Sequence, residues 1–136
     1  MDSEIARIVR ERAGFRCEYC RLPDHLHPGP FEFEHIVAEQ HGGKTVIGNL
    51  AYACLRCNRH KGPNLAGIDL ATSRTRLVRL FDPRRHHWNH HFRWDGPVIV
   101  GRTPIGRVTI AVLAMNDSLR VALRAELIEE GIFPSE

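Results

Sequence analysis

The chain has 136 residues, of which 43% are hydrophobic and 26% charged, with a formal net charge of +3 and a pI of about 8.9. These values are ordinary for a globular protein and exclude wholesale disorder, and the length suits one domain with a modest core. No stretch approaches the roughly 20 apolar residues that span a bilayer, and the charged N-terminus lacks the apolar core of a signal peptide. We therefore expect a cytoplasmic protein that does not enter membranes.

The first half of the chain predicts a helix, two strands and a second, short helix. Residues 3–13 carry apolar side chains at helical spacing, and residues 31–37 alternate apolar and polar side chains as a strand does. A glycine-containing loop separates this strand from a second one at 49–53, and a short helix is expected to begin near residue 55 and to end near Gly62.

The second half predicts a hairpin and two further helices. Strands 92–94 and 98–100 flank a turn, and Thr103 precedes Pro104 as the cap of a helix. A last helix at about 118–130 carries one apolar stripe, consisting of Leu119, Leu123 and Leu127. We expect the tryptophans of this half, Trp88 and Trp94, to pack the hairpin onto the first half.

The two halves show no sharp break in composition. Residues 63–75 are the expected linker between them, and neither a repeat nor a low-complexity segment is present. We therefore expect a single domain over 1–136, with a core at about 3–66 and an accessory part at about 76–133.

Four cysteines form two matched CxxC motifs, Cys17–Cys20 and Cys54–Cys57. Each motif presents two thiolates from one tight turn, and two such motifs together suit a tetrahedral zinc site with Zn–S bonds of about 2.3 Å. Four sulfur ligands leave no open coordination position, so this zinc would be structural. The alternatives are a redox pair or buried free thiols.

A second set of motifs lies between and just after the cysteines. It comprises Glu34-His35-Ile36, Gly42-Gly43, Asn49-Leu50 and the segment 57–62, which reads Cys-Asn-Arg-His-Lys-Gly. In this order, with both CxxC motifs, the stretch from Cys17 to Gly62 resembles the HNH endonuclease motif in its zinc-containing form, a member of the ββα-metal (His-Me finger) nucleases. The resemblance implies an α+β fold with a ββα-metal core, to which the C-terminal hairpin and two helices are added.

The resemblance also implies a division of catalytic roles. His35 is the general base that activates water, for which imidazole suits neutral pH. Glu34 and Asn58 are oxygen ligands of a divalent cation that stabilises the phosphorane and the 3′-oxyanion, and His60 is a possible third ligand or a solvated helix residue. The ion is Mg²⁺, or Mn²⁺, Ni²⁺ or Zn²⁺ if the nitrogen of His60 takes part. Glu34 departs from the family, which more often has Asp or His there.

The geometry of a strand limits how these residues meet. Neighbouring side chains of a regular strand face opposite sides, so the backbone has to leave the strand at His35 if Glu34 and His35 are to serve one site. Asn49 is expected to hold this departure through hydrogen bonds to the backbone or to the ring of His35, and a simple turn residue is the alternative. Gly42 and Gly43 are expected to form only a flexible loop.

Nucleic-acid contacts are expected from the short helix. Arg56, Arg59 and Lys61 would present positive charge to the phosphate backbone, although Lys61 could instead cover the helix end. The predicted activity is therefore metal-dependent cleavage of DNA. The alternatives are a non-catalytic zinc module that binds nucleic acid or protein, and a nuclease that acts on RNA or branched DNA.

Two pairs of histidines, His86–His87 and His90–His91, suggest a second metal site. We expect these side chains to be solvated or packed instead. The sequence does not indicate the oligomeric state.

Overall fold

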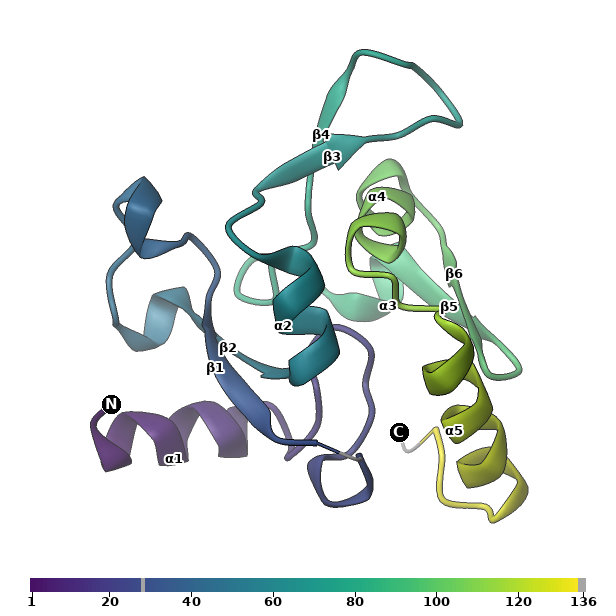
Figure 1. Cartoon of the computed structure of the whole chain (residues 1–136), viewed down its shortest axis with the longest axis horizontal. Helices are drawn as coiled ribbons and strands as arrows, with labels where there is room; N and C mark the ends of the chain where they lie inside the picture. The colour runs from purple at the N-terminus through teal and green to yellow at the C-terminus, as the bar shows by residue number, and fades with distance from the viewer. Residues whose placement is uncertain (28, 135–136) are drawn as a thin grey trace.

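A computed structural model describes residues 1–27 and 29–134. Positions 28, 135 and 136 of the expected domain lie outside the described residues. In chain order the helices and strands are α1 (Ser3–Arg12), β1 (Phe31–His35), β2 (Leu50–Cys54), α2 (Leu55–Lys61), β3 (Ala66–Ile68), β4 (Leu77–Arg79), α3 (Trp88–His91), β5 (Phe92–Asp95), β6 (Val98–Gly101), α4 (Pro104–Val112) and α5 (Ser118–Glu129) (Figure 1). This order confirms the α+β class and the succession of two strands and a helix in the first half.

The antiparallel β1–β2 hairpin has two different faces. Phe33 pairs with Tyr52, and their rings meet Val9 of α1 on one side. Glu34 pairs with Ala51, and this side faces α2, since cross-strand partners share a face. The hairpin thus lies between α1 and α2 (Figure 1). Strand β1 ends at His35 instead of residue 37, so the chain leaves the strand at the residue that was expected to be the general base.

The expected linker at 63–75 is in part a strand. β3 pairs with β4 in a small antiparallel hairpin, and Gly67 of β3 lies under Val108 and Val112 of α4. A Cβ at Gly67 would lie 2.8 Å from a methyl carbon of Val108, so the close approach requires glycine. The sequence did not predict these strands, because three-residue strands with a central glycine carry little periodic pattern.

The C-terminal elements follow the predicted caps. Gly96 turns the β5–β6 hairpin with φ of +58°, and the Thr103 hydroxyl accepts a hydrogen bond of 3.1 Å from the Gly106 amide at the start of α4. Helix α5 departs from the expected pattern. Leu119 is 51% exposed, whereas Arg120 and Arg124 are fully buried beside Leu127.

One hydrophobic core joins the two halves of the chain. Its buried members run from the cysteines through Phe81, Phe92 and Met115. Trp88 belongs to it and donates a 2.7 Å hydrogen bond from its indole nitrogen to the carbonyl of Tyr19, which lies between Cys17 and Cys20. The tryptophans therefore pack the C-terminal half onto the first half, as expected.

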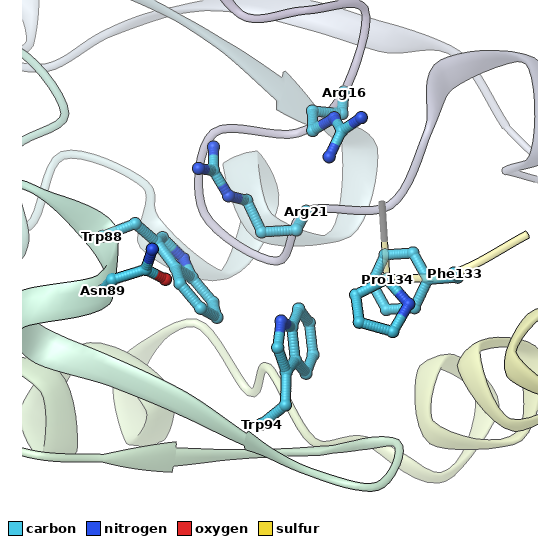
Figure 2. Close-up of a pocket in the computed structure, with 7 residues that line it drawn as sticks. All are labelled: Arg16, Arg21, Trp88, Asn89, Trp94, Phe133 and Pro134. Atoms are coloured by element: carbon cyan, nitrogen blue, oxygen red, sulfur yellow. The ribbon is translucent and has the colours of Figure 1, made fainter. Parts of the chain in front are cut away.

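A pocket of about 410 Å³ opens where the two halves meet. Trp88 and Trp94 form one side of it and Arg16 and Arg21 another, and the guanidinium of Arg21 lies 5.4 Å from the ring centre of Trp88 (Figure 2). The ring of Phe133 closes the pocket against Trp94. The loop that carries the first CxxC motif is thus held by side chains from the C-terminal half.

Within the described part of the chain, no helix combines the length and the apolar character needed to cross a membrane.

Candidate active site and metal centre

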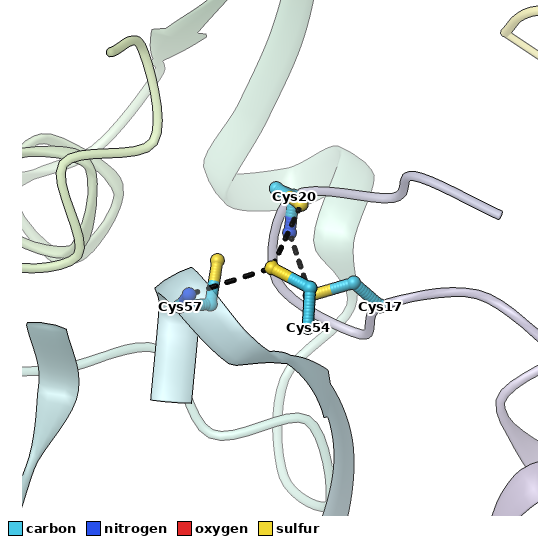
Figure 3. Close-up of side chains that lie close together, drawn as sticks. All are labelled: Cys17, Cys20, Cys54 and Cys57. Atoms are coloured by element: carbon cyan, nitrogen blue, oxygen red, sulfur yellow. Dashed lines mark hydrogen bonds between the residues drawn. The ribbon is translucent and has the colours of Figure 1, made fainter. Parts of the chain in front are cut away.

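The four cysteines come together in the interior. All are buried, and one sulfur from each lies within 4.8 Å of the others (Figure 3). Cys17 and Cys20 come from the loop after α1, whereas Cys54 ends β2 and Cys57 lies in the first turn of α2. Each motif turns tightly, since the amides of Cys20 and Cys57 donate to the sulfurs of Cys17 and Cys54 over 3.4 Å.

The donor set fits a zinc ion. A tetrahedron with Zn–S bonds of about 2.3 Å has sulfurs about 3.8 Å apart, and the sulfurs of Cys20 and Cys54 are 3.7 Å apart. Burial raises the pKa of the Cys17 and Cys57 thiols, so a cation is needed if all four are to be thiolates. With four sulfurs and no open position, such an ion would hold the fold and not react with substrate.

His35 lies at the end of β1 on the edge of a surface pocket of about 420 Å³. Its Nε2 is 2.8 Å from the hydroxyl of Thr45 and 3.6 Å from a carboxylate oxygen of Glu39. The side chain is 22% exposed, so the ring is reachable from solvent and is not turned into the core. Neither Thr45 nor Glu39 was predicted, because loop side chains that turn back onto a strand leave no periodic signal.

Asn49 holds the segment that follows His35. Its side-chain oxygen accepts from the Val37 amide over 2.9 Å, and its nitrogen donates to the carbonyls of Val37 and Lys44 over 3.0 Å. Its backbone carbonyl accepts from Ile36. These are the backbone contacts expected of Asn49, and they fix the departure of the chain from β1.

Gly43 is more than part of a flexible loop. A Cβ at this position would lie 1.7 Å from the carbonyl oxygen of Val37 and 2.9 Å from the Asn49 amide nitrogen. The backbone of the loop packs directly onto the segment after β1, which only glycine allows. Gly42, with φ of +87° and open space around it, makes the turn that precedes this contact.

Glu34 lines the pocket of His35, but its carboxylate is buried and already has partners. Its side chain is 3% exposed, one oxygen lies 2.6 Å from the ammonium of Lys61, and the other accepts a 2.6 Å hydrogen bond from the Tyr19 hydroxyl. Burial raises the pKa of Glu34, and the contacts with Lys61 and Tyr19 oppose that shift. The carboxylate therefore neutralises a buried lysine on the side of the hairpin that faces α2.

Lys61 does not present its charge to solvent, as the expected contact with nucleic acid would require. Its side chain is 2% exposed, and its ammonium also donates to the carbonyl of Ile36 over 2.9 Å. In this position it ties α2 to β1 and cannot reach a phosphate.

Asn58 and His60 diverge on α2. Positions two apart on a helix do not share a face, and Asn58 lines the pocket of His35 whereas His60 is exposed and is not among the lining residues. The amide nitrogen of Asn58 donates to Glu32 over 2.9 Å. The arrangement thus brings Glu34 and Asn58 to the pocket of His35 and leaves His60 outside it.

The two expected arginines have different surroundings. Arg59 is exposed and lines the pocket of His35. Arg56 forms a 2.9 Å ion pair with Asp117, the residue before α5, so its positive charge is partly neutralised within the protein.

The four histidines of the two pairs are either packed against aromatic rings or exposed. His86 and His91 pack against the ring of Phe81, and burial lowers the pKa of both, whereas His87 and His90 are exposed. Across residues 1–27 and 29–134, the four cysteines are the only group of three or more Cys, His, Asp or Glu placed to hold an ion. The expectation of packed or solvated histidines is confirmed.

Comparison with known proteins gives one match. The family model described as HNH endonuclease matches residues 17–64. No curated protein and no solved structure matches the chain. The match covers both CxxC motifs, the β1–β2 hairpin and α2, and it supports a nuclease-type function. Residues 17–64 of this chain therefore match the HNH endonuclease family, and the other residues lie outside the match.

Proposed function

We propose that the protein is an endonuclease that hydrolyses phosphodiester bonds of DNA, with His35 as the general base. The observation that carries the proposal is the placement of the His35 ring, which lines one open pocket together with Asn58 and Arg59. A zinc-binding module without activity would have no need for an imidazole held in this position.

Thr45 selects which nitrogen of His35 reacts. If Nε2 carries the proton and donates it to the Thr45 hydroxyl over 2.8 Å, Nδ1 keeps a free lone pair. Nδ1 can then take a proton from a water molecule as its oxygen attacks phosphorus, while the bond from phosphorus to the 3′-oxygen breaks and the departing 3′-oxygen takes up a proton from solvent. The carboxylate of Glu39, 3.6 Å from Nε2, would stabilise the imidazolium that results.

Arg59 is the cation that the described residues offer at this pocket. Its exposed guanidinium can bind two phosphate oxygens at once and so reduce the charge that repels the attacking water. Arg56 can add to the attraction of the DNA backbone, with less freedom because of its ion pair with Asp117.

The predicted cation ligands are only partly gathered at this pocket. Glu34 and Asn58 both line it, but the carboxylate of Glu34 already contacts Lys61 and Tyr19, and His60 lies off the pocket. His35, Thr45 and Arg59 would act on the water and the phosphate themselves, and the assay with Mg²⁺, Mn²⁺ or Ni²⁺ measures whether cleavage needs a cation.

The test compares wild type, His35→Ala and His41→Ala on plasmid DNA and on RNA, with each metal ion and with a chelator. His41 is an exposed histidine in the same connection between β1 and β2, so it controls for the loss of a nearby imidazole. We expect the wild type and His41→Ala to nick DNA, and His35→Ala to be slower by about 100-fold or more, the usual scale for a general base.

Equal rates for wild type and His35→Ala would contradict the assignment of the base. Binding of DNA without cleavage under every metal condition would identify a binding module instead, and cleavage of RNA alone would change the substrate.

A further inference from the structure

A buried arginine from the C-terminal helix touches the cysteine cluster. Nη1 of Arg120 lies 2.8 Å from the sulfur of Cys57 and 3.8 Å from that of Cys54, and the residue has no exposed surface. Arg120 belongs to α5, outside the residues that match the HNH family. Neither the CxxC motifs nor the helical pattern of α5 predicts this contact.

The guanidinium is fixed in place by groups other than the cysteines. Its Nε donates to the Asp117 carboxylate over 2.7 Å, and Nη2 donates to the carbonyls of Leu113, over 2.8 Å, and Ala114. The planar guanidinium thus has two sets of partners. Nε and Nη2 donate to groups in the turn between α4 and α5, while Nη1 points at sulfur. Because its side chain is already fixed, Arg120 loses little further conformational entropy when it donates a hydrogen bond to a thiolate.

The charge of a zinc tetrathiolate explains why a cation is needed there. One Zn²⁺ and four thiolates carry a net charge of −2, and the four cysteines lie in a hydrophobic core from which water is excluded. An unbalanced charge in such a place is costly, and hydrogen bonds from a cation to the ligand atoms reduce that cost. Arg120 supplies both a positive charge and a directed N–H to sulfur.

We infer that Arg120 is part of the zinc centre, where it stabilises the charged thiolates and makes retention of the metal depend on α5. The centre then requires residues from both ends of the chain, and the segment 17–64 alone lacks one of its components. This inference depends on the tetracysteine site and not on the proposed nuclease activity.

Arg124 provides a matched control in the same helix. It is as fully buried as Arg120, and it donates to the carbonyls of Pro97 and Met115 over 2.7 and 2.9 Å. None of its hydrogen bonds in the described structure goes to a sulfur. Replacing it removes a buried guanidinium from α5 without removing a hydrogen bond to a cysteine sulfur.

The experiment measures zinc loss from purified full-length wild type, Arg120→Met, Arg120→Lys and Arg124→Met. Each protein is challenged with a chelator and a colorimetric zinc indicator, zinc content is verified by elemental analysis, and thermal unfolding is recorded in parallel. In cobalt-substituted protein, the thiolate-to-cobalt absorption band reports directly on the sulfur ligands.

We expect Arg120→Met to lose zinc about 10 to 100 times faster than wild type, the range for removing a partner of a metal ligand. Arg120→Lys should fall between the two, because it keeps the charge but not the planar donor set. Arg120→Met should also shift the cobalt band, whereas Arg124→Met should lower the unfolding temperature with little change in zinc loss or in the band.

Zinc loss at the wild-type rate in Arg120→Met would overturn the inference. Equal acceleration in Arg120→Met and Arg124→Met, with an unshifted cobalt band in both, would also overturn it by showing that Arg120 acts only through the packing of α5. If Arg120→Met does not fold, Arg120→Lys is compared with Arg124→Lys by the same measurements.

Discussion

Glu34 and His35 are neighbours in sequence, and they face different surroundings. Both line the same pocket, but the alternation of the strand turns Glu34 towards α2, where its buried carboxylate contacts Lys61 and Tyr19, whereas His35 stands at the end of β1 and is partly exposed to solvent. The spacing of the two CxxC motifs predicted the cysteine cluster, and the resemblance to the HNH motif proposed His35. The motif did not predict the ion pair between Lys61 and Glu34, because this pair depends on how α2 packs on the hairpin.

This burial predicts a role in stability for Glu34. Glu34→Gln leaves the Lys61 ammonium without a counter-charge in the interior, which should reduce the free energy of unfolding by about 3–5 kcal/mol. Urea denaturation measures the loss. The double variant Glu34→Gln/Lys61→Met should lose less than the sum of the single variants, because it removes both charges. If Glu34→Gln unfolds at the wild-type urea concentration, the carboxylate is not held as described.

At the scale of elements, the sequence predicted those that carry strong local signals. The Asp-Gly-Pro turn gave the β5–β6 hairpin, and the Thr-Pro pair gave the start of α4. β3, β4 and the four-residue α3 were missed because they are too short to show a period. The stripe of α5 was misassigned because Arg120 and Arg124 are buried, and burial of arginine follows from partners that lie far away in sequence.

The connection between β1 and β2 offers a test of how backbone packing supports the site. Gly43→Ala would push the loop away from Val37, because the added carbon would overlap its carbonyl oxygen at 1.7 Å. Asn49 and Thr45 belong to the same connection, so we expect the rate of DNA cleavage to fall by about tenfold or more, as misplacement of catalytic groups produces.

Gly48→Ala is the control for this substitution. Gly48 lies in the same connection with nothing within 4 Å of its Cβ position, and we expect nearly normal cleavage from this variant. Wild-type rates from Gly43→Ala, measured on the same plasmid substrate, would show that the close contact with Val37 does not position the site.

At the scale of the whole molecule, the cysteine cluster is the point where distant parts of the chain meet. The loop after α1, the junction of β2 and α2, and Arg120 of α5 all converge on it, and Trp88 bonds to the carbonyl of Tyr19 within the first CxxC motif. Core residues of both halves meet in one cluster that includes the cysteines, while a second, smaller cluster packs α1 onto the β1–β2 hairpin. Loss of the metal should therefore affect the halves together and not one after the other.

Removal of zinc tests this coupling. We expect a strong chelator at neutral pH to shift the emission of Trp88 and Trp94 and to reduce the far-ultraviolet circular dichroism in a single transition, because binding free energy of a structural metal is folding free energy. Added zinc should restore both signals. Two separate transitions, with tryptophan emission unchanged after elemental analysis shows the zinc to be gone, would mean that the C-terminal half folds on its own. The contacts of Trp88 and Arg120 with the CxxC motifs would then join two independently folding units and would not stabilise one common core.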